Sequence, residues 1–137
     1  MDEHLKSIHV KVGDTSHLVE GLAILCGEDI ILIVGGGSAY HIGSVAVAYS
    51  HPSLRNALKT TSTASVITMM GHKEDEITRS ASLKISHSLN RTVTLTVGLH
   101  LDNASAEDIA ILVQNFNTLV DLVIEKLEKS PGYKKVD

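Results

Sequence analysis

Alternation of hydrophobic and polar residues predicts that the first half of the chain forms β-strands. Residues 4–12 alternate, and residues 18–26 and 30–34 are largely apolar. Short turns containing glycine and aspartate separate these three segments, so we expect them to pair in antiparallel fashion. Two further strands are expected. Residues 45–49 alternate valine and tyrosine with small residues, and residues 60–70 are rich in β-branched residues.

The hydrophobic period changes in the second half of the chain. Apolar residues recur every four positions over residues 74–89, which predicts a helix. Residues 92–99 alternate strictly between threonine or glycine and valine or leucine, which predicts a half-buried strand. Ser105 and Asp108 resemble a capping box at the start of a long amphipathic helix, whose apolar stripe places Phe116 in the core.

These elements predict one α+β domain spanning residues 1–137. We expect an antiparallel sheet of about six strands with two helices, both on the same face of the sheet. The opposite face is less hydrophobic but carries no charge. A second subunit could partly cover it, so we expect a homodimer.

Composition excludes several classes of function. The net charge is −4, and the chain has no basic cluster large enough for a nucleic-acid interface. No apolar run approaches the roughly 18 residues that a membrane span requires. The single cysteine, Cys26, cannot form an internal disulfide and is expected to be a small buried residue. A reducing, cytoplasmic location is therefore expected.

The segment Gly35–Gly43 is the first candidate for a functional site. Three consecutive glycines follow an apolar strand, and Tyr40 and His41 lie between them and Gly43. This connection is longer than the two residues that a plain hairpin needs. It has neither a dinucleotide-binding fingerprint nor a phosphate-binding P-loop pattern. A ligand-binding loop is our preferred interpretation, and a flexible surface loop is the alternative.

Three histidines, His41, His72 and His100, follow the ends of predicted strands, each near a glycine. Strand ends can converge on one edge of a sheet, where imidazoles can bind a metal, shuttle protons or hold phosphate. A helix beginning near Lys73 would add free N–H groups for an anion. The spacing matches no zinc motif, so a metal site is the less favoured interpretation. No serine or cysteine has the surroundings of a nucleophile, and we predict no catalytic residue.

The same residues carry a resemblance to a known family. Over about residues 15–125 the chain resembles the prenylated flavin chaperone LpdD-like proteins, which include the small D subunits associated with UbiD-type hydroxyarylic acid decarboxylases. The matching blocks, in order, are Gly36-Gly37, residues 41–48, residues 62–65, residues 71–76 and residues 98–103.

The resemblance implies a fold similar to that of proteasome assembly chaperones, working as a dimer. It also implies that the protein helps a UbiD-type decarboxylase subunit to acquire or keep prenylated flavin mononucleotide, or FMN. The positions that it marks for cofactor binding are Gly36, Gly37, Tyr40, His41, Gly43, Gly71, His72, Lys73, His100 and Asn103.

Within this set, glycine N–H groups and Lys73 would suit the phosphate, and the histidines would contact the ring system or the partner. Many relatives have a proline where this chain has Tyr40, whose ring could itself stack on the isoalloxazine. Two other functions stay open. One is a protein-interaction module like the proteasome assembly chaperones, without a small ligand. The other is a small enzyme that uses the histidine cluster.

Overall fold

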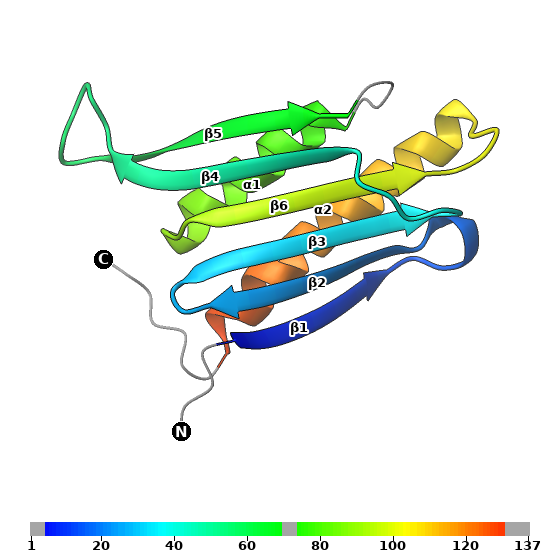
Figure 1. Cartoon of the computed structure of the whole chain (residues 1–137), viewed down its shortest axis with the longest axis horizontal. Coiled ribbons are helices and arrows are strands. Elements are labelled where there is room, and N and C mark those ends of the chain that lie inside the picture. Colours follow the sequence, from blue (N-terminus) through cyan, green and yellow to red (C-terminus); the bar gives the residue numbers. More distant parts are fainter. Residues whose placement is uncertain (1–4, 70–73, 131–137) are drawn as a thin grey trace.

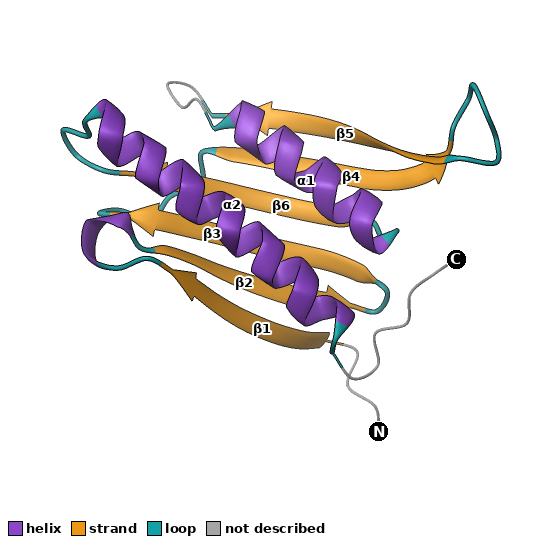
Figure 2. Ribbon diagram, turned by 180° about the vertical axis from the view of Figure 1, so that it is seen from behind, coloured by secondary structure: helices purple, strands orange, loops and turns teal. Residues whose placement is uncertain are grey.

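The computed structural model describes residues 5–69 and 74–130, which form a sheet with helices on one face (Figures 1 and 2). The described elements are β1 (Leu5–Val12), the short 3-10 helix η1 (Thr15–His17), β2 (Val19–Cys26), β3 (Asp29–Gly37), β4 (Ser44–Pro52), β5 (Thr60–Thr68), α1 (Asp75–Leu89), β6 (Val93–His100) and α2 (Ala106–Glu128). The α+β class and the placement of both helices are confirmed. The helix η1 was not predicted.

The strand order is β1-β2-β3-β6-β4-β5. Consecutive strands pair in antiparallel fashion, as predicted, except that β6 lies between β3 and β4. β6 is antiparallel to β4 but parallel to β3. The sheet is therefore mostly antiparallel, and its one parallel pair in the described residues lies at its centre.

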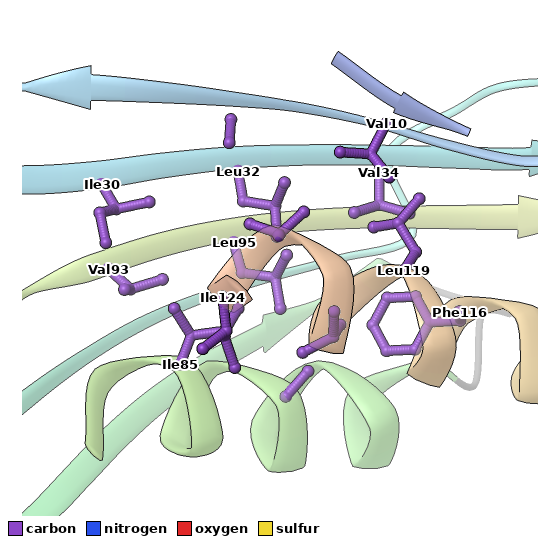
Figure 3. Packing of buried hydrophobic residues seen from close by; sticks show 14 of the residues in the cluster. Val10, Ile30, Leu32, Val34, Ile85, Val93, Leu95, Phe116, Leu119 and Ile124 are labelled. Carbon is purple, nitrogen blue, oxygen red and sulfur yellow. The ribbon is translucent and has the colours of Figure 1, made fainter. Parts of the chain in front are cut away.

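Hydrophobic side chains from the sheet and both helices form the core between the two layers (Figure 3). Alternate residues of each central strand point into it, including Leu32 of β3 and Leu95 of β6, and both are fully buried. From α2, Phe116 and Leu119 are fully buried, and this helix packs over β1 and β2 (Figure 3). The predicted core position of Phe116 is confirmed.

The first helix approaches the sheet through small side chains. Ala46 and Ala48 of β4 are fully buried beneath α1, which turns Ala81 and Ser82 toward the sheet. The hydroxyl of Ser50 reaches α1 and donates to the carbonyl of Ser86 over 2.9 Å. The small-residue face expected on this strand therefore lets the helix pack closely against it.

Two local expectations about the strands were wrong. Gly35 to Gly37 were expected to end the strand as a loop, but they are the last residues of β3. Gly35 and Gly36 pair with both β2 and β6, and Gly37 pairs with β6. Cys26 is exposed rather than buried, because it ends β2 on the side away from the helices. Within residues 5–69 and 74–130, neither long helix is apolar enough over a sufficient length to cross a membrane.

The predicted capping box of α2 is confirmed. The N–H of Asp108 donates to the Ser105 hydroxyl, and the N–H of Ser105 donates to the Asp108 carboxylate. His17 Nε2 lies 2.8 Å from the same carboxylate, which ties η1 to the helix start. These hydrogen bonds, led by those from Ser105 and His17, lower the pKa of Asp108 to about 2.

Replacing Phe116 by alanine should lower the free energy of unfolding by about 3–5 kcal/mol, because it removes a fully buried ring and leaves a cavity. Ile109→Ala on the same helix is the control, since Ile109 is 54% exposed and its loss should cost well under about 1 kcal/mol. Urea denaturation of both variants measures the difference. Equal midpoints would show that the core assignment is wrong.

Asp108→Asn should destabilise the protein near neutral pH, and the difference from wild type should vanish in acid. The folded-state pKa of Asp108, about 2, lies below its ordinary 3.8. Its stabilisation is therefore complete above the ordinary value and is lost as the pH falls through the folded value. Thermal melts from neutral to strongly acidic pH test this.

Glu107→Gln is the control for that series, because Glu107 lies in the same helical turn but takes no part in the capping box. A difference between Asp108→Asn and wild type that stays constant down to the lowest pH would contradict the assignment.

Candidate functional site

The candidate site lies where the two parallel strands of the sheet end. Because β3 and β6 run in the same direction, their carboxyl ends meet at the same edge. His100 is the last residue of β6, and His41 lies in the connection of residues 38–43 from β3 to β4. In Figure 1 this connection passes in front of β6, on the sheet face that the helices leave open. The topology thus brings these two predicted residues together.

Glycine at two positions allows the chain to cross β6. A Cβ atom on Gly98 would lie 1.7 Å from the carbonyl oxygen of His41, so no other residue fits beneath the crossing. Gly37 has φ +82°, and a Cβ there would lie 1.9 Å from the carbonyl oxygen of His100. Both glycines therefore hold the connection directly against the end of β6.

Hydrogen bonds fix the connection at both of its ends. The N–H of Ser38 donates to the carbonyl of His100 over 2.7 Å, and the N–H of Gly43 donates to the carbonyl of Val97 over 2.9 Å. The Ser38 hydroxyl also accepts a 3.4 Å bond from the N–H of Asp102. The segment that carries His41 is consequently tied to β6 and to the turn after it.

The imidazoles of His41 and His100 contact each other edge to face, with ring centroids 5.8 Å apart and an interplanar angle of 80°. His100 Nε2 lies 2.8 Å from a carboxylate oxygen of Asp102. On the other side, His41 Nε2 lies 3.8 Å from a carboxylate oxygen of Glu74, the residue that caps α1. Two imidazoles therefore lie between two carboxylates.

Solvent exposure decreases along this row of four side chains, from Asp102 through His100 and His41 to Glu74. The Asp102 side chain is 78% exposed and that of His100 44%, whereas His41 and Glu74 are 23% and 11% exposed. A ligand or partner arriving from solvent would meet Asp102 and His100 before His41 and Glu74. Imidazoles in such a row can donate hydrogen bonds to an anion or transfer protons.

Tyr40 extends the site across the open face of the sheet. Its ring lies on the backbone of Gly35, where an added Cβ would come within 2.6 Å of it. Its hydroxyl donates to a carboxylate oxygen of Glu20 on β2 over 3.0 Å. His9 and Lys11 of β1 contact the same carboxylate. Tyr40 is 53% exposed, so its outer ring face remains available.

The electrostatics of this contact follow from the hydrogen bond. The hydrogen bond from Tyr40 is the largest single cause that lowers the pKa of Glu20, and His9 and Lys11 lower it further. Burial, and then the bond to Glu20, raise the pKa of Tyr40. Both effects keep Glu20 ionised and Tyr40 protonated, which maintains the hydrogen bond between them.

The other predicted site residues lie in different places. Gly36 faces the helices and packs on Leu99, away from the imidazoles, whereas Gly43 lies against the Glu74 carboxylate. Asn103 adopts a left-handed conformation in the exposed turn after β6. Gly71, His72 and Lys73 lie outside the described residues.

Sequence reasoning did not select three carboxylates of the site, those of Glu20, Glu74 and Asp102. Glu20 interrupts an otherwise apolar strand, which was the available signal. Glu74 stands in the same matching block as His72, residues 71–76, which was the available signal for it. Among the described residues, no group of three or more histidine, cysteine, aspartate or glutamate side chains is arranged to hold a metal ion.

Comparison with known proteins gives a family and a fold. A family model described as "Prenylated flavin chaperone LpdD-like domain" matches residues 13–128. The structure resembles one solved in a "novel chaperone complex for yeast 20S proteasome assembly", with a TM-score of 0.58 and 19% sequence identity. That match covers 93% of this chain and 98% of the other. No curated protein is significantly similar in sequence.

Gly98→Ala should displace the crossing and destabilise the protein by about 1–3 kcal/mol, since the added methyl group overlaps the backbone of His41. Thr96→Ala is the control, because Thr96 precedes Gly98 on the same face of β6 and its side chain is only partly buried. Denaturant titration of both variants provides the measurement. An unchanged midpoint for Gly98→Ala would refute the tight crossing.

Proposed function

We propose a function that starts from the family of this chain, which belongs to the prenylated flavin chaperone LpdD-like domains. In this proposal the site formed by His41 and His100 binds prenylated FMN. The protein then acts as a non-catalytic chaperone that helps a UbiD-type decarboxylase to acquire or keep this cofactor. The observation that carries the proposal is the contact between His41 and His100 at the crossing of β6, within the stretch that matches the family.

The chemistry of the site supports a flavin nucleotide. Imidazole N–H groups are suitable donors to a phosphate, and charge-assisted hydrogen bonds of this kind are the stronger ones. The exposed ring face of Tyr40 offers a flat aromatic surface on which an isoalloxazine can stack. An apolar platform beside a few polar groups is the usual composition of a cofactor site.

The exposure of the site supports transfer rather than retention. His100 and Tyr40 are each about half exposed, so a ligand held there stays in contact with solvent or with an approaching protein. A chaperone has to release its cofactor to the acceptor enzyme. An open site at a sheet edge meets that requirement better than an enclosed pocket.

A second candidate function is a protein-interaction module without a small ligand. The observation that favours it is the likeness of the whole chain to a proteasome assembly chaperone, which at 19% identity concerns the fold. Under this function the histidines would contact a protein partner instead of a flavin.

Replacing His41 by alanine should weaken binding of prenylated FMN about tenfold or more, since it removes one donor to a charged ligand. Titration of the protein into oxidised FMN and into prenylated FMN, followed by flavin fluorescence, measures this. Stability should change little, because the His41 side chain remains partly exposed.

His87→Ala is the matched control. His87 is an exposed histidine in the last turn of α1, whereas the candidate site adjoins the first turn of that helix. Equal affinity of wild type and His41→Ala would reject the site. Absence of binding by wild type with either flavin would reject the cofactor function and favour the second candidate.

A further inference from the structure

The loop that joins β4 to β5 carries two leucines that lie almost wholly in solvent. Leu54 is 100% exposed and Leu58 is 97% exposed. Single exposed apolar side chains are ordinary, but two of them on one short loop form a cluster that the core does not use. In Figure 1 this loop extends beyond the ends of the two strands that it joins. We call residues 53–59 the hairpin tip.

Hydrogen bonds hold the hairpin tip in an ordered conformation. The N–H of Ser53 donates to the carbonyl of Lys59 over 2.7 Å, and the N–H of Lys59 donates to the carbonyl of Asn56 over 3.0 Å. The Ser53 hydroxyl accepts a bond from the N–H of Arg55. The Asn56 side chain accepts one from the N–H of Leu58. Because the backbone is already ordered, little conformational entropy would be lost when a partner buries the leucines.

The spacing of the apolar residues indicates the shape of the surface that the tip fits. Leu54, Ala57 and Leu58 stand at positions i, i+3 and i+4, and all three are exposed. Residues at this spacing share one side of a helical turn, and amphipathic segments use it to enter apolar grooves. A narrow, protruding tip of this kind fits a concave apolar pocket.

The hairpin tip is a basic element on an acidic chain. Arg55 and Lys59 stand beside the leucines, and both are exposed. Residues 30–73 contain no aspartate or glutamate, whereas the whole chain has a net charge of −4. The surface that complements the tip is therefore apolar at its centre and carries carboxylates around it.

This distribution of charge favours a protein over a membrane as the partner. An anionic bilayer would attract Arg55 and Lys59, but it would also repel the acidic remainder of the molecule. Membrane binding grows with the buried apolar area, and two leucines bury little of it. The carboxylates of a protein pocket, in contrast, can be confined to the place where the tip enters.

We propose that the hairpin tip docks into an apolar pocket with an acidic rim on the acceptor decarboxylase. The choice of this partner rests on the proposed function, whereas the exposure and charge of the tip do not. The tip and the connection that carries His41 lie at opposite ends of β4. At about 3.3 Å per residue, this strand separates them by roughly 26 Å. The candidate site is therefore accessible to the cofactor while the tip holds the partner.

The test is the affinity of the full-length protein for a purified UbiD-type decarboxylase without its cofactor, measured by biolayer interferometry. Leu54→Ser and Leu58→Ser should each weaken binding about tenfold or more, because each removes a leucine that docking buries. Replacing Arg55 and Lys59 together by glutamate should slow association, most strongly at low salt. Circular dichroism melts establish that these surface variants are folded.

Ile109→Ser is the matched control, because Ile109 is 54% exposed but lies on α2, outside the tip. It should bind the decarboxylase as wild type does. Folded tip variants with wild-type affinity, or the absence of a complex with wild type, would overturn the docking. Binding to phosphatidylglycerol vesicles that Leu54→Ser abolishes, without binding to the decarboxylase, would overturn it in favour of a membrane.

Flavin fluorescence on the same variants separates this inference from the cofactor function. Leu54→Ser and Leu58→Ser should bind prenylated FMN as wild type does, because the tip lies far from His41 and His100. Loss of flavin affinity in the tip variants would contradict a separate docking element. A wild type that binds the decarboxylase through the tip but binds no flavin would support the docking and reject the cofactor function.

Discussion

The insertion of β6 between β3 and β4 is the constraint on which the candidate site depends. These two strands follow each other in the chain but are not neighbours in the sheet, so residues 38–43 must pass over β6. Any side chain at the crossing point would collide with that backbone, which requires Gly98. The contact between His41 and His100 is a consequence of this crossing.

The two faces of the sheet differ in how much they contribute to stability. The helix face holds the large, fully buried side chains, such as Phe116 and Leu95. The open face contributes few buried contacts, so it can carry exposed groups such as Tyr40 and His100 at little cost to stability. The candidate site residues Tyr40 and His100 therefore lie on the face that contributes least to the core.

Local sequence patterns predicted the helices and strands well. The features that they did not predict depend on pairing between strands that are distant in sequence. The alternation of β6 and the capping box of α2 are confirmed, because both depend on neighbours in sequence. Gly35 to Gly37 belong to a strand because β6, which is distant in sequence, pairs with all three of them. Likewise, His41 and His100 were expected to converge at one edge of an antiparallel sheet, but they do so through the parallel pairing of β3 and β6, which hydrophobic alternation does not encode.

The charged residue Glu20 shows why the connection between β3 and β4 differs from an ordinary surface loop. A carboxylate in a largely apolar strand is favourable here because Tyr40 donates to it across Gly35. Tyr40 thereby reaches β2, while the other end of the connection begins β4. The segment is thus anchored over four adjacent strands. This anchoring holds the imidazole of His41 against that of His100, and such preorganisation would lower the entropic cost of binding at the candidate site.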